Sequence, residues 1–312
     1  MSAAFDTSFF PESFTTFPTR LHKNEHRIAA RCDAVVEKFR RLAPTKNPLS
    51  YGAGPHGVFY AFLFPEGETE KTLLCAELIE SAWLYDDVIE ALPHEEAALT
   101  HATVKQMFMV GLQEASSDPG SRPHKPSITD IFQDIASRMM ALDPKGTPWV
   151  LGTQVQYWGE HDSSKDSFYH IEDYVRYRIL NIGFRIMVSA MQWCLDIYLS
   201  DEETTLSEAF YTSAARVVVL TNDYWSRNKE KDEVTDRVRN AIPVVMHQYS
   251  MNEADASIFV KGMIVDAEQK TRALGLQLDK QSDTLNSFVH GIFLMLGGGA
   301  FWSSTCPRYN NV

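Results

Sequence analysis

The sequence predicts an all-α protein with a single domain over residues 1–312, and three observations support this fold class. Apolar residues recur every three or four positions along most of the chain, as they do on the buried face of a helix. Stretches rich in Gly, Pro and polar residues interrupt this pattern, notably residues 116–126, 143–146 and 162–165. The alternation of a half-buried β-strand with hairpin signals does not compete with it.

The predicted helices follow one another closely. The first begins near Asn24, and its apolar residues share one face: Ile28, Cys32, Val35, Val36, Phe39 and Leu42. The second runs from Thr69 to Ile89. Further helices are expected at about 95–114, 128–142, 147–160, 167–199, 203–229, 233–249, 252–275 and 282–303. A chain of 312 residues is long enough to bury one substantial helical core.

Composition narrows the possible functions. The net charge of −12 argues against a nucleic-acid partner, which needs a broad basic surface. No run approaches the roughly 20 apolar residues of a transmembrane helix, and residues 1–20 do not read as a secretory signal. We therefore expect no transmembrane segment and a cytoplasmic location. The cysteines stand far apart and are expected to be reduced thiols: Cys32, Cys75, Cys194 and Cys306.

Acidic residues close the helix that begins at Thr69. It ends in Asp86-Asp87-Val88-Ile89-Glu90, and the side chains of Asp86 and Glu90 lie one above the other because they are four positions apart. Negative charge at a helix C-terminus is unfavourable, and stacked carboxylates repel unless a cation lies between them. Oxygen ligands suit Mg²⁺. Asp86, Asp87 and Glu90 are therefore candidate metal ligands, and acidic residues that simply face water are the alternative.

A second set of oxygen ligands lies in the helix predicted over 203–229 and just beyond it. Asn222, Ser226 and Glu230 are spaced by four, so they turn only about 80° around the helix over about 12 Å. Helical side chains lean toward the N-terminus, which lets Glu230 reach back toward Ser226. Their summed charge of −1 is low for a Mg²⁺ site, so oxygens of an anionic ligand must complete the coordination. Metal and substrate should therefore bind together.

These two segments resemble the metal motifs of class I terpene synthases. Residues 222–230 resemble the fungal form of the Asn-Ser-Glu triad, Asn-Asp-x-x-Ser-x-x-Lys-Glu, and residues 86–90 resemble the aspartate-rich motif. The resemblance extends over the whole chain and is strongest to the cyclase halves of fungal bifunctional di- and sesterterpene synthases. It implies the α-helical bundle of the isoprenoid synthase fold with a central cavity, three Mg²⁺ ions, and a covalently linked prenyltransferase domain in a longer protein.

The resemblance also implies a set of groups that bind the diphosphate. Arg178 takes the position of the diphosphate-sensing arginine, Arg308 and Tyr309 match a C-terminal Arg-Tyr pair, and Lys229 lies within the triad motif. Guanidinium groups make bidentate contacts to phosphate oxygens. Asn181 and Ile182 take the linker and effector positions of the sensor segment: Asn181 stands where the family usually has Asp, and an amide can orient Arg178 but cannot pair with its charge.

Aromatic side chains near the motifs are candidates to line the cavity around a carbocation, because aromatic faces attract cations. They are Phe59, Trp83, Trp225 and Trp302, of which Trp83 and Trp302 lie within two helical turns of a motif. A place in the helical core is the alternative for each of them. The run Gly297-Gly298-Gly299 lacks the strand and loop of a phosphate-binding motif and predicts a thin helix wall.

The expected function is Mg²⁺-dependent ionisation of a linear isoprenoid diphosphate, followed by cyclisation. The C20 substrate geranylgeranyl diphosphate is the first choice, and the C25 substrate geranylfarnesyl diphosphate is the second. A sesquiterpene synthase, a chain-elongating prenyl diphosphate synthase and a noncatalytic helical interaction module remain as alternatives. The cyclase hypothesis requires that Asp86 and Glu230 face one shared cavity.

Overall fold

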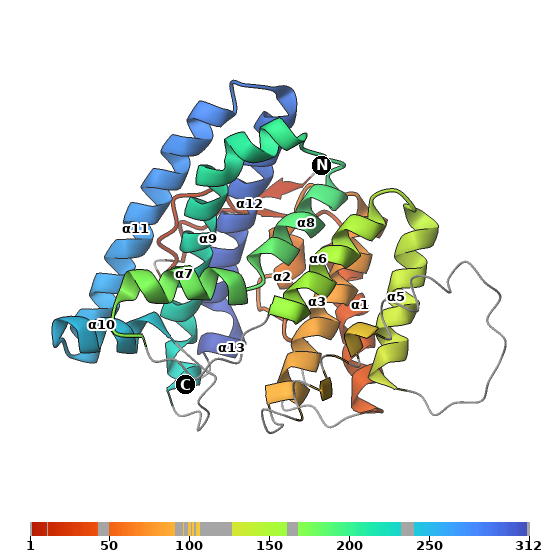
Figure 1. Cartoon of the computed structure of the whole chain (residues 1–312), viewed down its shortest axis with the longest axis horizontal. Coiled ribbons are helices and arrows are strands. Elements are labelled where there is room, and N and C mark those ends of the chain that lie inside the picture. Colours follow the sequence, from red (N-terminus) through yellow and green to blue (C-terminus); the bar gives the residue numbers. More distant parts are fainter. Residues whose placement is uncertain are drawn as a thin grey trace.

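Helices make up most of the protein, as the hydrophobic periodicity predicts (Figure 1). The structure is a computed structural model that describes residues 2–10, 12–42, 50–90, 96, 99–100, 102, 104–106, 127–160, 168–231 and 240–310, without the side chains of residues 87, 90, 159 and 160. In chain order the helices are α1 (Glu25–Arg40), α2 (Phe59–Leu63), α3 (Thr69–Glu90), α5 (Ile128–Leu142), α6 (Thr147–Glu160), α7 (Ile171–Asn181), α8 (Phe184–Cys194), α9 (Asp201–Glu230), α10 (Ala241–Tyr249), α11 (Glu253–Leu278), α12 (Asp283–Thr305) and α13 (Pro307–Asn310).

Side-chain caps mark the starts of three long helices, α9, α11 and α12. Ser200 accepts a hydrogen bond from the backbone N–H of Glu203 at the start of α9, and Glu203 bonds back to the Ser200 backbone. Asn252 and Ser282 cap α11 and α12 in the same way. Each of these side chains satisfies an N–H group that the first turn of a helix leaves unpaired.

The structure differs from the predicted elements in several places. The helix expected over 167–199 is divided into α7 and α8 at Gly183, whose φ of 73° lies in the left-handed region. Of the helix expected over 233–249, the structure describes α10 from Ala241, where Asn240 is the N-cap, and residues 232–239 lie outside the described residues. A two-residue antiparallel pairing of β1 (Ala3–Ala4) with β2 (Arg20–Leu21), which the sequence did not suggest, fastens the N-terminal segment. Most of the expected helix 95–114 lies outside the described residues.

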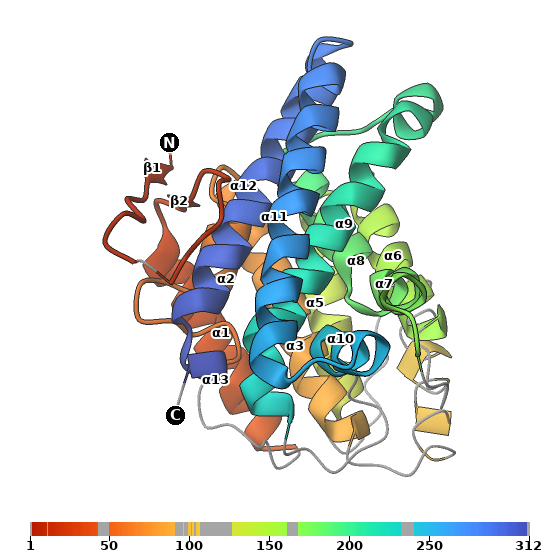
Figure 2. The same ribbon diagram turned by 90° about the vertical axis from the view of Figure 1, so that its left-hand side faces the viewer.

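The bundle is built around α9 and α12, with α11 at one edge and α5 at the other (Figure 1). Figure 2 shows α9, α11 and α12 standing side by side. Large side chains at the centre are fully buried, among them Trp193, Trp302, Tyr60, Tyr85 and Phe210. All four cysteines are buried and free, as expected.

Helix α12 has the length and apolar composition of a membrane span, which the sequence pattern did not suggest. Of its most apolar window, 67% is buried inside the protein, mainly against α2 and α9. Part of this packing depends on glycine. A Cβ at Gly298 would lie 2.2 Å from the backbone oxygen of Phe62 in α2, so only glycine allows the two backbones to approach this closely.

Helix directions bring several helix ends together at one end of the bundle. The backbone N–H of Glu68 donates to the Cys194 carbonyl at 2.8 Å, so α3 starts where α8 ends. The indole N–H of Trp193 donates to Asp143 at 2.9 Å, so α6 also starts near the end of α8. Helices α3 and α6 therefore run antiparallel to α8, and their C-terminal ends lie near the α7–α8 junction.

Candidate active site

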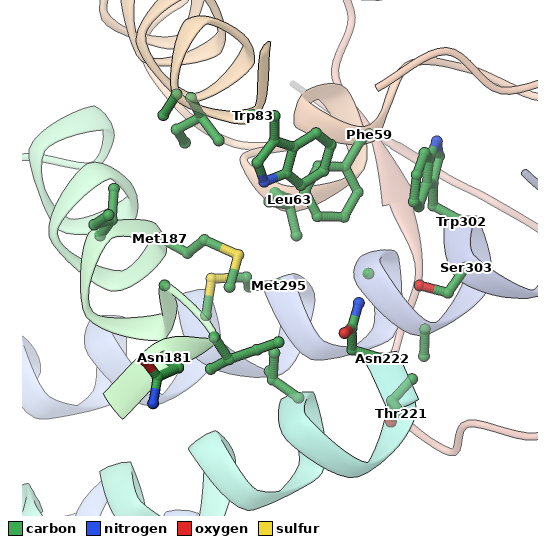
Figure 3. Close-up of a pocket in the computed structure, with 18 of the residues that line it drawn as sticks. Phe59, Leu63, Trp83, Asn181, Met187, Thr221, Asn222, Met295, Trp302 and Ser303 are labelled. Carbon is green, nitrogen blue, oxygen red and sulfur yellow. The ribbon is translucent and has the colours of Figure 1, made fainter. Parts of the chain in front are cut away.

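A cavity of about 260 Å³ opens between the helices, and its lining residues come from α2, α3, α6, α7, α8, α9, α12 and α13 (Figure 3). Its volume is close to the lower end of small-molecule pockets, roughly 300–1,000 Å³. Asp86 and Glu230 both line it, although they are 144 positions apart in the sequence. The requirement that these two carboxylates share one cavity is met.

The polar end of the cavity is organised around Asn222 on α9. Its amide oxygen accepts a hydrogen bond from the guanidinium of Arg178 at 3.1 Å, and its amide nitrogen donates to the Tyr309 hydroxyl at 2.9 Å. Arg178 comes from α7 and Tyr309 from α13, so one side chain connects three helices. Burial raises the pKa of Tyr309 to about 12, so its hydroxyl remains a hydrogen-bond donor at neutral pH.

Asp223 holds Arg178 in place. Its carboxylate lies 3.4 Å from the Arg178 Nε atom, and it also accepts hydrogen bonds from the Tyr174 hydroxyl and from the Ala241 backbone N–H. Desolvation raises the pKa of Asp223 to about 6, against the opposing effect of Arg178. Burial, the largest single effect, would lower the pKa of Arg178, but the charges of Asp223 and Glu230 together with the Tyr174 and Tyr157 hydroxyl groups outweigh it and raise that pKa. Arg178 is thus a charged, preoriented donor.

The sequence shows that Arg178 lacks its usual Asp partner, because Asn181 occupies that position; a surface pairing with Glu172 or Asp173 is the alternative for Arg178. The structure places that carboxylate on α9, at Asp223, while the Asn181 amide donates to the Tyr177 carbonyl at 3.0 Å. Asn181 and Ile182 both line the cavity at the end of α7. The Asn181 carbonyl accepts a hydrogen bond from the Tyr157 hydroxyl at 3.0 Å.

The predicted ligand triad on α9 contains a buried hydroxyl that lacks a protein partner. Ser226 is 1% exposed, and its Oγ has no hydrogen-bond partner in the part of the chain that the structure describes. Glu230 lines the cavity and accepts a hydrogen bond from the Asn240 amide at 2.9 Å. A buried hydroxyl without a partner costs about 1–3 kcal/mol. The free oxygen of Ser226, between Asn222 and Glu230 on one helix, fits a divalent cation with oxygen ligands.

On the opposite wall, Asp86 is the member of the acidic motif that the structure describes in full. It lies in the last turns of α3 and lines the cavity. The side chains of Asp87 and Glu90 lie outside the described part of the structure. Among the described side chains, no three His, Cys, Asp or Glu residues form a metal-binding group, and a site of Asn, Ser and Glu ligands contains only one residue of those types.

The remaining two predicted cations also reach the cavity. Arg308 stacks on the ring of Tyr51, with its guanidinium carbon 4.2 Å from the ring centre, and lies 5.8 Å from the Trp83 ring centre. Lys229 lines the cavity from the end of α9. Together with Arg178, these residues place three positive charges around the end of the cavity that carries Asp86 and Glu230.

Three of the four predicted aromatic residues form a continuous wall (Figure 3). The ring centre of Phe59 lies 4.7 Å from that of Trp302 and 5.1 Å from that of Trp83. The indole N–H of Trp302 donates to the Gly52 carbonyl at 3.0 Å, which leaves its ring available to the cavity. The Trp225 ring is not among the described residues that line the cavity, and it stacks on Phe14 from the N-terminal segment, with ring centres 6.1 Å apart.

Sequence reasoning missed three residues. Asp223 shares a helix face with Val219, Leu220 and Ser226, and a charge on a buried face signals a partner. Buried Glu80 accepts hydrogen bonds from the backbone N–H groups of Tyr51 and Gly52. The Tyr51 ring in turn contacts Arg308, and the Gly52 carbonyl accepts the hydrogen bond of Trp302. Gln154, on α6, lines the cavity. Nothing in the local sequence distinguishes it from its neighbours.

Comparisons with known proteins bear on the family and the fold of this chain. The family model described as terpene synthase family 2, C-terminal metal binding, matches residues 77–270. Ophiobolin F synthase of Cochliobolus heterostrophus is 28% identical over 295 residues, which are 90% of this chain and 38% of that protein. A bifunctional terpene synthase of Fusarium proliferatum is 26% identical over 95% of this chain and 41% of its own length. The chain thus spans about two fifths of these relatives.

Solved structures show the same fold. Aristolochene synthase from Penicillium roqueforti superposes with a TM-score of 0.74 at 17% identity, over 94% of this chain and 98% of its own. A cucumene synthase variant gives a TM-score of 0.74 at 14% identity, over 95% of this chain and 100% of its own. The bundle is therefore the isoprenoid synthase fold expected from the sequence. Since the family model covers more than half of the chain, including α9 with its metal motif, this protein belongs to the terpene synthase family.

Proposed function

We propose that this chain is a class I terpene cyclase domain that ionises geranylgeranyl diphosphate, the C20 substrate, and cyclises the resulting carbocation. One observation supports this most directly: a single cavity joins Asp86, Arg178, Asn222 and Glu230 to an aromatic wall. A charged end suits the diphosphate, and an apolar end suits the hydrocarbon. Neither an interaction module nor a structural role requires a charged end and an apolar end in one cavity.

The metal sites in this proposal use the predicted ligands. Asp86, with Asp87 and Glu90, would hold two Mg²⁺ ions, and Asn222, Ser226 and Glu230 would hold a third. The unpartnered Ser226 hydroxyl supports the site formed by Asn222, Ser226 and Glu230. Bound Mg²⁺ supplies positive charge that stabilises the departing diphosphate.

The chain's own cations bind the same group. Arg178, Lys229 and Arg308 would contact diphosphate oxygens, and Tyr309 would donate a hydrogen bond. Asp223 and Asn222 already hold Arg178 in orientation, so little reorganisation is needed as negative charge develops on the leaving group. These groups lower the barrier to C–O cleavage electrostatically.

The apolar end of the cavity protects the carbocation that C–O cleavage produces. Phe59, Trp83 and Trp302 line this end, and an aromatic ring face is worth about 0.5–2 kcal/mol to a nearby cation. In this proposal, the apolar lining also keeps bulk water from the cation until cyclisation is complete.

The C25 substrate is the second candidate, because a sesterterpene synthase of Colletotrichum orbiculare is 22% identical over 95% of this chain. We further propose that the chain is one domain of a longer bifunctional protein with a linked prenyltransferase domain. The 38–41% coverage of its relatives, one of which is called bifunctional, supports this.

The test is incubation of the purified chain with C15, C20 and C25 diphosphates, each with Mg²⁺ and with chelator, followed by gas chromatography–mass spectrometry. A cyclic product from the C20 substrate that requires Mg²⁺ is expected. A longer diphosphate formed only with isopentenyl diphosphate would indicate an elongating enzyme instead. If Asn222→Ala has the wild-type circular dichroism spectrum and unchanged turnover, the proposed site is wrong.

A further inference from the structure

Gln154 is a buried amide that faces the cavity without a protein partner. It lies on α6, is 0% exposed, and lines the cavity. Neither its side-chain oxygen nor its side-chain nitrogen has a hydrogen-bond partner in the described chain. Most buried side-chain amides in proteins are hydrogen-bonded, so this exception needs an explanation.

The position of Gln154 along α6 places it away from the diphosphate end. Tyr157, three residues later on the same face, donates to the Asn181 carbonyl at the α7–α8 junction, next to the charged groups. Helix α6 starts at the opposite end of the bundle, where Asp143 accepts from Trp193. Gln154 is therefore about 4.5 Å deeper in the cavity than Tyr157. The α8 and α12 side chains of that cavity are mainly apolar, including Met187 and Met295 (Figure 3).

An amide in this setting does not stabilise the fold. Each buried donor or acceptor without a partner carries a desolvation penalty, and an apolar residue of the same shape would avoid it. The amide does present a dipole whose oxygen is the negative end. Rotation about the terminal side-chain torsion can turn the oxygen toward the cavity. In surroundings of low polarity, a dipole acts strongly on a nearby charge.

We propose that Gln154 is a specificity-determining residue whose amide oxygen contacts the carbocation and selects the carbon at which positive charge resides. This inference rests on the proposed cyclase function. The aromatic wall attracts a cation over a broad ring face, whereas a single amide oxygen marks one point in the cavity. Gln154 thus favours one branch of the cyclisation without taking part in diphosphate release.

The test compares Gln154→Met, which removes the dipole and nearly keeps the length and volume, with Gln156→Met as the matched control. Gln156 is an exposed glutamine on the same helix. Products are quantified by gas chromatography–mass spectrometry, diphosphate release is measured separately, and thermal melting is recorded. The reactions are run in ¹⁸O-labelled water.

For Gln154→Met we expect the main cyclic product to fall roughly tenfold relative to products formed from carbocations that leave the cyclisation early. The reason is that small changes in relative barriers redistribute products. Diphosphate release should stay within about threefold of wild type, since ionisation depends on the charged end. The melting temperature should be unchanged or higher, because an unpaired amide has been removed. The control should match wild type in all three measurements.

Three results would overturn the inference. The first is an unchanged product profile in Gln154→Met. The second is a lower melting temperature, which would give the amide a structural role. The third is a labelled alcohol that wild type makes and the variant loses, which would mean that Gln154 holds a water molecule instead of contacting the cation. A wild-type chain that cyclises none of the substrates would refute the proposed function itself, and this inference with it.

Discussion

At the scale of single residues, some buried polar groups of the site have a hydrogen-bond partner in the described chain and others do not. Asp223 has partners on both carboxylate oxygens, and its role is to hold Arg178. Ser226, one helical turn further along α9, has a free hydroxyl in the described part of the chain. Pairing within the protein indicates a structural task, whereas a free oxygen beside Asn222 and Glu230 indicates a ligand.

Ser226→Ala should reduce turnover without reducing stability. Loss of a ligand near a metal typically costs tenfold to about hundredfold in activity. The melting temperature should be unchanged, because the hydroxyl has no partner in the described structure to lose. Diphosphate release and thermal melting measure the two effects.

Ser213→Ala on the same helix is the matched control. The Ser213 hydroxyl is buried and bonded to that of Thr271 at 2.8 Å. This variant should lose about 1 kcal/mol of stability and keep its turnover. If both serine variants lose stability equally and neither loses turnover, Ser226 is not a ligand.

Glu80 gives a prediction about pH. Desolvation raises its pKa from 4.5 to about 7, although Tyr60 and the Gly52 backbone N–H donate to it. The folded state therefore binds this proton more tightly than the unfolded state. The resulting stability is present below about pH 4.5 and is lost as the pH rises to about 7. A tenfold difference in proton affinity is worth ~1.4 kcal/mol, so the loss is on the order of 3 kcal/mol.

Urea unfolding of wild type and Glu80→Gln between pH 4.5 and 8 tests this. The difference in unfolding free energy between the two proteins should change from about pH 4.5 to about pH 7 and be flat from there to pH 8, because the variant cannot titrate at this position. Parallel curves for the two proteins would mean that Glu80 keeps an ordinary pKa.

At the scale of elements, the α7–α8 junction positions the polar end of the cavity. Arg178, Asn181 and Ile182 occupy the last turn of α7 and its cap, and Gly183 turns the chain into α8 with a φ of 73°. A continuous helix would carry these side chains around a single axis. The break lets α7 cross toward Asn222 on α9 while α8 continues antiparallel to α3.

Gly183→Ala should cost about 1–3 kcal/mol of stability through backbone strain alone, because no atom within 4 Å would meet the new Cβ. It should also lower turnover, since relief of the strain would move Arg178. Chemical unfolding and diphosphate release measure the two effects.

Gly152→Ala in α6 is the control. This glycine is exposed and helical, and a methyl group added there would meet no atom within 4 Å. Alanine should stabilise the protein by roughly 0.5–1 kcal/mol at this position. If both variants changed the free energy of unfolding by the same amount relative to wild type, the left-handed turn at Gly183 would not be required.

At the scale of the whole molecule, opposite charges gather at one end of an acidic protein. The chain carries a net charge of −12, yet Arg178, Lys229 and Arg308 line the same cavity as Asp86 and Glu230. The α9 triad contributes a charge of only −1. Cations and diphosphate should therefore each bind weakly alone and strongly together.

Thermal melting with inorganic diphosphate and Mg²⁺ measures this coupling. Together they should raise the melting temperature by several degrees, since ligand at 100 times its dissociation constant adds ~2.7 kcal/mol of stability. Either one alone should have a much smaller effect, and the joint increase should disappear in Asn222→Ala. Equal shifts from Mg²⁺ alone and from the pair would contradict the shared site.

The sequence alone determined the helical class, most helix positions, and the spacing of Asn222, Ser226 and Glu230, because these depend on periodicity within one element. Tertiary structure decided which side chains meet. It paired Arg178 with Asp223, 45 positions away, turned Trp225 toward Phe14, and left the amide of Gln154 facing the cavity. A helical repeat fixes the face on which a side chain lies, but its partners come from helices distant in the chain, whose packing no local pattern specifies.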